Sequence, residues 1–278
     1  MRVYRYFDAK GGLATLKSRQ MRFASPLSFN DPFELTPRII EPSDELLEER
    51  LRTDLWVNEF FERCGRGRAL TEEESRKEYF ANELPRRLEK LRASKAEKTE
   101  KLKWELVGQF AEHYRLLCCS HTHDSILMWS HYAFRHSGLV LEIETDEMIP
   151  GVNLAPCIFD VHYRTSPPTV PALYSNLELF EKSLNLVFTT KAIEWSYEEE
   201  VRIQVPAPNH LKKDEPHDQE FDPKCIKRVI VGCYNDPSAK TYETADELAE
   251  HSDYKHALFQ RACLDLHDYK LRFADRPC

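Results

Sequence analysis

The sequence predicts an α+β fold in which a mixed, mainly antiparallel sheet forms the core, helices flank it and a helical insertion interrupts it. Short β-prone runs, such as RVYRYF at 2–7 and IKRVIVGC at 226–233, are typical of sheet strands. Apolar residues recur at helical spacing through residues 41–115. The chain has 278 residues, of which 41% are hydrophobic, which is sufficient for a substantial core. We therefore expect a single domain over residues 1–278 with an inserted helical subdomain at 41–115.

Short apolar runs and the turn-forming residues between them predict the individual elements. We expect strands at 2–7, 21–24, 116–120, 139–143, 158–163, 226–233 and 271–273. We expect helices at 11–19, 173–186 and 241–250, a helix after His121 that Asp124 or Ser125 caps, and a short helix or strand at 257–268. Loops should cover the end of 21–34, which contains Asn-Asp-Pro, and 206–223, which is rich in Pro, Asp and His.

The stretch Val187–Gln204, VFTTKAIEWSYEEEVRIQ, predicts a strand that the chain enters through the aromatic corner Trp195-Ser196-Tyr197. Side chains alternate between the two faces of a strand. The apolar face should therefore carry Tyr197, Val201 and Ile203, with Glu199 as an exception to its apolar character. The polar face should carry Glu198, Glu200, Arg202 and Gln204. Two carboxylates and a guanidinium in one row form either a solvated sheet face or the polar wall of a binding site.

Composition argues against several classes of protein. The chain has only 8 glycines and lacks both GxGxxG and GxxxxGK[ST], so no glycine-rich phosphate loop is expected. A net charge of −8 is unlike that of proteins that coat nucleic acids. No run of 18 apolar residues predicts a membrane span, and the first residues lack the apolar region of a signal peptide. We expect a cytoplasmic protein whose eight cysteines, which form no CxxC pair, stay reduced.

Several motifs together resemble the bacterial family DUF2971, a domain of unknown function. The resemblance begins with Tyr4-Arg5-Tyr6 and RFASPLSFNDPFE at 22–34. It continues through SILMWSHYAFRHSGLVLEIE at 125–144, Lys191, EWSYEEEVRI at 194–203 and VIVGC at 229–233. It spans nearly the whole chain apart from the helical insertion, and it implies a family but little mechanism.

A more distant resemblance is to ADP-ribosyltransferases. In that group a strand carries Arg or His, a second strand carries a small hydroxyl residue, and a later strand carries a catalytic Glu. Arg5 is similar to the first motif, Ser25 (or nearly as well Ser28) to the second, and Glu198 and Glu200 have the E-x-E spacing of the third. The chain departs from the pattern because it has no clear Ser-Thr-Ser.

The resemblance implies NAD as cofactor and a protein or nucleic-acid acceptor. Cleavage of the nicotinamide–ribose bond develops an oxocarbenium-like cation, which a fixed carboxylate stabilises. Glu200 would stabilise this charge and hold a ribose hydroxyl, and Glu198 would orient the acceptor. Arg5 would hold phosphate or ribose with its donor fork, and Arg202 would line the cleft or pair with the carboxylates.

Other candidates have both structural and functional interpretations. Asn30 and Asp31 either close a turn on their own backbone or border the same cleft. Trp129, His131 and Tyr132 lie within one helical turn and are either core residues or groups that stack a ring and transfer a proton near pH 7.

A metal site is one further hypothesis. A zinc site could be formed by Cys118, Cys119, His121 and His123, but these residues lack the second ligand pair of a structural zinc site, so we predict no metal.

The alternative to an NAD-dependent enzyme is a non-enzymatic interaction or sensor module, as in toxin or phage-defence systems. In such a module the Glu/Arg row is a structural ion network. The enzyme hypothesis requires Arg5, Ser25 and Glu200 to converge on one concave pocket.

Overall fold

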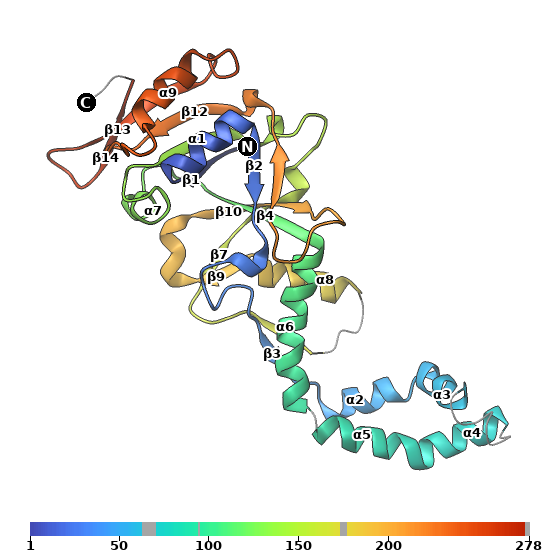
Figure 1. Cartoon of the computed structure of the whole chain (residues 1–278). Helices are drawn as coiled ribbons and strands as arrows, with labels where there is room; N and C mark the ends of the chain where they lie inside the picture. Colours follow the sequence, from blue (N-terminus) through green and yellow to red (C-terminus); the bar gives the residue numbers. More distant parts are fainter. Residues whose placement is uncertain (63–70, 94, 173–176, 276–278) are drawn as a thin grey trace. The chain divides into compact units, whose positions relative to one another are not determined.

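The computed structural model describes residues 1–62, 71–93, 95–172 and 177–275 (Figure 1). The chain divides into two compact units. The first comprises Met1–Leu35, Val107–Pro167 and Phe188–Cys278, and the second comprises Thr36–Leu106 and Pro168–Val187. Each unit is described by itself.

The first unit is built on an eight-stranded sheet in the order β14-β13-β12-β5-β1-β4-β10-β6. From one edge to the other, its strands are Leu271–Ala274, Leu258–Leu264, Ile226–Val231, Leu139–Glu144, Arg2–Phe7, Tyr114–Ser120, Glu200–Pro206 and Ile158–Asp160. Only β12 and β13 pair in parallel, and every other neighbouring pair in this sheet is antiparallel. The α+β prediction with a mixed, mainly antiparallel sheet is confirmed.

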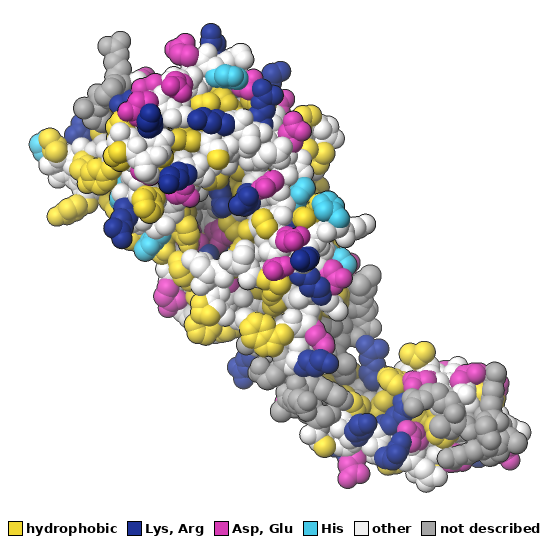
Figure 2. Space-filling model, viewed as in Figure 1, with side chains coloured by type: hydrophobic (Ala, Val, Ile, Leu, Met, Phe, Trp, Pro, Cys, Tyr) yellow, Lys and Arg dark blue, Asp and Glu magenta, His cyan; other side chains and the backbone are white. Residues whose placement is uncertain are grey.

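The face of the molecule drawn in Figure 2 carries lysine, arginine, aspartate and glutamate side chains intermixed. Among the coloured side chains of this face, no large basic patch is seen (Figure 2). No helix in the described ranges has both the length and the apolar character needed to cross a membrane.

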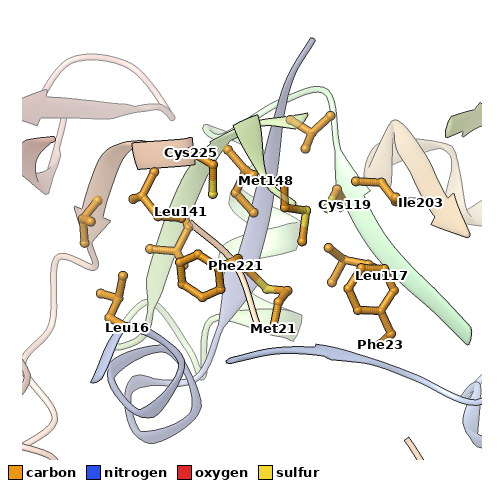
Figure 3. Packing of buried hydrophobic residues seen from close by; sticks show 14 of the residues in the cluster. Leu16, Met21, Phe23, Leu117, Cys119, Leu141, Met148, Ile203, Phe221 and Cys225 are labelled. Atoms are coloured by element: carbon orange, nitrogen blue, oxygen red, sulfur yellow. The ribbon is translucent and has the colours of Figure 1, made fainter. Parts of the chain in front are cut away.

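One face of the sheet is covered by α1, Ala9–Ser18, and by a small two-stranded sheet. The two strands of that sheet are β2, Gln20–Phe23, and β11, His217–Glu220. Asp8 caps α1 by accepting a hydrogen bond from the amide of Gly11. Leu16, Met21, Phe23, Phe221 and Leu117 meet in this core with side chains from β5 and β10 (Figure 3).

The other face is covered in part by α7, Ile126–Tyr132. The N-cap of this helix is Ser125, which is one of the two residues predicted for that position. Met128 and Trp129 of this helix pack against Tyr6, Val140 and Ile230 of the sheet. A third helix, α9 at Thr241–Glu250, lies within its predicted bounds and contacts α1. β7, His162–Arg164, pairs in parallel with β9, Thr190–Ala192, in a separate two-stranded sheet.

The second unit is mainly helical. It contains α2 Asp44–Leu51, α3 Asp54–Phe60, α4 Glu72–Glu78, a π-helical turn Tyr79–Glu83, α5 Leu84–Ala93, most of α6 Lys95–His113 and most of α8 Leu177–Phe188. β3, Arg38–Ile40, pairs with β8, Thr169–Pro171. Its core clusters around Tyr79, whose hydroxyl donates to the carbonyl of Leu51. Within the described residues, the helical character predicted for residues 41–115 is therefore present up to His113, after which β4 begins. Residues 63–70 and 94 of the predicted range lie outside the described residues.

Three local predictions are wrong. The predicted continuous strand over 187–204 is instead the end of α8, β9, a 3₁₀ helix at Ile193–Glu198 and β10. The predicted strand over 158–163 is divided into β6 and β7 at Val161. The predicted loop over 206–223 contains β11, which forms because its backbone pairs with β2.

The cysteines follow the prediction only in part. Cys118, Cys119, Cys157, Cys225 and Cys233 are free thiols. Cys263, however, is disulfide-bonded, so the expectation of fully reduced cysteines is wrong at this position.

Candidate functional site

The register of three neighbouring strands brings the N-terminal strand close to the acidic segment near residue 200. Tyr4 of β1 lies opposite Ser120 of β4, and Ser120 lies opposite Glu200 of β10. Arg202 lies opposite Cys118 two positions along the same strands. Because β4 is the one strand between β1 and β10, side chains of these three strands that lie on the same face can border a common space.

A cavity of about 220 Å³ occupies this space. Residues from β1, β4, β10, α7, β9, the 3₁₀ helix at 193–198 and the loop after β2 line it. The lining is Tyr4, Arg5, Tyr6, Ala24, Ser28, Phe29, Asn30, Glu34, Leu116, Cys118, Cys119, Met128, Tyr132, Lys191, Glu198 and Glu200. It combines four aromatic rings with a small number of charged groups, which is the usual character of a small-molecule site.

Five charged side chains form a connected network at one wall of the cavity. Lys191 Nζ donates to Glu198 Oε2 at 2.6 Å and to Glu200 Oε2 at 3.0 Å. Arg202 donates through Nε to Glu200 Oε1 at 2.8 Å and through a second nitrogen to Glu34 Oε1. The network therefore joins three carboxylates to two cations.

The network is buried. The five side chains retain between 1% and 5% of their solvent exposure. The interpretation of the Glu/Arg row as a solvated sheet face is therefore wrong. The predicted alternation itself holds along β10, because Glu200 and Arg202 lie on this face while Val201 and Ile203 belong to the hydrophobic core.

Glu198 reaches the network by a different route from the one predicted. It is the last residue of the 3₁₀ helix, and Glu199 after it has a left-handed backbone with φ of 42°. This turn brings Glu198 beside Glu200 although the two do not belong to one strand. Tyr132 of α7 donates its hydroxyl to Glu198 Oε1, and Ser120 donates to the carbonyl oxygen of Glu198 at 2.6 Å.

Burial and pairing shift the protonation equilibria of the network in opposite directions. Burial raises the pKa of Glu34 to about 7, and it outweighs the attraction of Arg202 and Lys191. Burial also acts against the ionised form of Glu200, but hydrogen bonds and charge from Arg202, with the charge of Lys191, lower the pKa of Glu200 to about 2. The carboxylates of the cluster hold the pKa of the Lys191 ammonium above its usual range despite burial.

Half of the residues predicted for the site border the cavity. Arg5, Asn30, Tyr132, Glu198 and Glu200 line it. Arg5 donates to the carbonyl oxygen of Cys118, and its Nε is buried without a hydrogen-bond partner among the described residues. Arg202 lies behind this wall and pairs with Glu200, as its alternative interpretation predicted.

The other predicted residues lie outside the lining. Ser25 is buried, caps the 3₁₀ helix Pro26–Ser28 and donates to the carbonyl of Lys213, whereas Ser28, its alternative, lines the cavity. Asp31 closes a turn by accepting from the amide of Phe33 at 2.9 Å. These contacts favour structural roles for both residues.

Trp129 and His131 also lie away from the cavity. Trp129 is fully buried in the core beneath α7, and its indole nitrogen donates to the carbonyl of His123 at 2.8 Å. His131 is exposed on the opposite side of the helix turn, with its ring 6.0 Å from that of Tyr197. Of the three residues predicted within one turn, only Tyr132 borders the cavity.

The sequence prediction of site residues did not include Glu34 or Lys191. Both belong to segments quoted for the family resemblance, but nothing in either local pattern indicates that they meet. Lys191 lies in β9 before the 3₁₀ helix and Glu34 lies in a turn between β2 and β3, so their proximity results from tertiary structure.

The residues considered for zinc are dispersed. Cys119 packs in the hydrophobic core, His121 contacts Asp160 at 2.7 Å, and the ring of His123 lies 4.8 Å from those of Tyr4 and Phe273. Within the described ranges, no three His, Cys, Asp or Glu side chains are grouped in a way that could hold a metal ion.

Residues 128–203 match the family model described as "Protein of unknown function (DUF2971)". The predicted resemblance to this family is confirmed over that segment, which contains Tyr132, Lys191, Glu198 and Glu200. No curated protein and no solved structure matches the chain.

Proposed function

We propose that this chain is a cytoplasmic NAD-dependent enzyme of the ADP-ribosyltransferase-like type, which cleaves the nicotinamide–ribose bond and transfers ADP-ribose to a protein or nucleic-acid acceptor. The observation that carries the proposal is the common cavity of Arg5, Ser28 and Glu200. These residues are the basic, hydroxyl and acidic groups of the three motifs, with Ser28 in place of Ser25.

The charge of the buried network suits this chemistry. With every group ionised, the three carboxylates and two cations of the network carry one net negative charge, and Arg5 adds a positive charge at the same cavity. Departure of nicotinamide leaves positive charge on the ribose, and a fixed negative field in a site of low dielectric stabilises it. Glu200 supplies that charge throughout the neutral pH range because its pKa is about 2.

The remaining lining supplies binding groups. Tyr4, Tyr6, Phe29 and Tyr132 surround the cavity with aromatic rings that can stack on a nicotinamide ring. Arg5 also borders the cavity, so its guanidinium supports the binding of a ribose or phosphate oxygen. A cavity of about 220 Å³ suits the nicotinamide end of NAD, with the rest of the dinucleotide outside it.

One observation favours the alternative of a non-enzymatic interaction or sensor module. Each carboxylate and each cation of the network has at least one partner within it, as expected of a structural ion network. In that case the cluster stabilises the sheet and the cavity takes no substrate.

The test is nicotinamide release from NAD by the full chain, followed by chromatography, together with transfer of labelled ADP-ribose to candidate acceptors. We expect Glu200→Gln to lose at least about 100-fold in rate, the size typical of removing one electrostatic stabiliser. Glu142→Gln is the matched control because Glu142 is also buried and pairs with Arg228 at 2.7 Å but does not line the cavity. Equal background turnover by wild type and folded Glu200→Gln would refute the proposal.

A further inference from the structure

The three carboxylates of the network differ in how their oxygens are used. Both oxygens of Glu200 accept hydrogen bonds, from Arg202 and Lys191. Both oxygens of Glu198 accept as well, from Tyr132 and Lys191. Glu34 accepts through Oε1 only, and the nearest cation to its Oε2 is Lys191 Nζ at 3.8 Å. Within the described residues, Glu34 is thus the carboxylate of the cluster that keeps one oxygen free of hydrogen bonds.

The backbone holds Glu34 in a fixed position at the cavity. Its amide donates to the carbonyl of Asp31 at 3.1 Å, and the side chain of Asp31 fixes the amide of Phe33. Arg202, which is 1% exposed, anchors the other carboxylate oxygen. A carboxylate that is anchored through one oxygen and open at the other has the geometry of a general base.

We propose that Glu34 is the proton acceptor of the site and takes the proton of the attacking nucleophile as that nucleophile bonds to the ribose. This proposal rests on the proposed function. In the simplest reaction the nucleophile is water. The C1′–N bond breaks and its electron pair leaves with nicotinamide, the water oxygen bonds to C1′, and one water proton passes to Glu34. ADP-ribose and nicotinamide are the products, and Glu34 later releases the proton to solvent.

The roles of the three carboxylates then differ because their surroundings differ. Glu34 is faced by Glu200 and Arg202 from β10, Lys191 from β9, Glu198 from the 3₁₀ helix, Cys118 from β4, Arg5 from β1 and Tyr132 from α7. Burial is the largest influence on it, and its pKa of about 7 lets it both accept and release a proton at neutral pH. Glu200, with a pKa of about 2, remains an ionised stabiliser and does not exchange protons there.

The experiment compares the pH dependence of nicotinamide release by wild type, Glu34→Gln and the control Glu142→Gln. We expect the wild-type rate to rise with pH and level off above about 7, as Glu34 becomes ionised. Glu34→Gln keeps a side-chain oxygen for Arg202 but cannot take the proton. Its rate should fall by about 100-fold or more and lose this pH dependence, while Glu142→Gln keeps the wild-type profile.

A second variant separates chemistry from folding. Glu34→Ala leaves space beside Arg202, and added formate should restore part of its rate if the site lacks only a base. Wild-type turnover with an unchanged pH profile in Glu34→Gln, or no rescue by formate in a folded Glu34→Ala, would overturn the role of Glu34 and leave the proposed function standing. Absence of nicotinamide release by wild type would overturn the proposed function and this role together.

Discussion

Replacing Glu34 by Gln should make the first unit more stable at neutral pH, although it removes one partner of a buried ion pair. The pKa of Glu34 is raised from 4.5 to about 7 by burial, so its ionisation in the folded chain is unfavourable. A difference of about 2.5 pH units corresponds to a free energy on the order of 3 kcal/mol. Gln remains uncharged at every pH and avoids this cost.

The direction of this pH effect on stability depends on whether the folded or the unfolded chain holds the proton of Glu34. Below pH 4.5 both the folded and unfolded chains carry protonated Glu34, and the stabilisation from its raised pKa is fully present. Between pH 4.5 and about 7 the unfolded chain loses this proton while the folded chain keeps it, so wild type loses stability as the pH rises. The stability of Glu34→Gln relative to wild type should therefore increase across this window by on the order of 3 kcal/mol and stay constant above it.

The assay is urea unfolding at several pH values from 4.5 to 8.5, followed by hydrogen exchange in peptides from β4 and β10. These strands report on the first unit, which need not unfold together with the second. Glu142→Gln controls for the general effect of replacing a buried carboxylate that pairs with arginine. A stability difference between wild type and Glu34→Gln that does not change between pH 4.5 and 8 would refute the reasoning.

Three further changes test other contacts of the first unit. Tyr132→Phe removes the hydroxyl that donates to buried Glu198 and should lower the free energy of unfolding by roughly 1–3 kcal/mol, and an unchanged urea midpoint would contradict this role. Arg115→Met removes a fully buried guanidinium that donates to four backbone carbonyls, two of them in the loop that contains Lys212 and Glu215. Amide hydrogen exchange in that loop should accelerate, and unchanged protection there would contradict this role of Arg115. Gly138→Ala places a Cβ 2.0 Å from the carbonyl oxygen of Phe7 and should cost roughly 1–3 kcal/mol or more, so wild-type thermal stability would be inconsistent with this close approach.

The fold class and most elements could be predicted because local patterns determine them. Apolar runs give β4, β5 and β12, and helical spacing with polar ends gives α9 at its predicted bounds. A cap at Asp124 or Ser125 could be predicted from short polar residues before an apolar helix, and the structure has Ser125 in that position. Each of these signals lies within a few residues of the element that it specifies.

The segment before β10 shows where such signals fail. Trp195-Ser196-Tyr197 is compatible with an extended strand, but the chain forms a 3₁₀ helix there and Glu199 adopts a left-handed backbone. A non-glycine residue in that conformation is uncommon, so sequence alone gives little warning of it. The alternation prediction remained useful from Glu200 onward because β10 is regular from that residue.

The site could be predicted only where one segment carries its residues. Glu200 and Arg202 alternate along one strand, so their common face could be derived. Glu34 and Lys191 meet them across separations of 168 and 9 residues, through contacts that no local period encodes. The choice between Ser25 and Ser28 likewise depended on the 3₁₀ turn, which buries the first and places the second at the cavity.

The composition of the buried network bears on whether it is structural or functional. A network kept only for stability would gain from equal numbers of cations and carboxylates, each fully hydrogen-bonded, because an unbalanced buried charge is costly. Here a third carboxylate, Glu34, exceeds the two cations and has a raised pKa, and it lies beside an open cavity. Groups that reduce stability are expected where activity requires them. A Glu34→Gln variant that is more stable and less active would favour the enzyme, whereas one that is more stable while the wild-type chain shows no turnover would favour the interaction module.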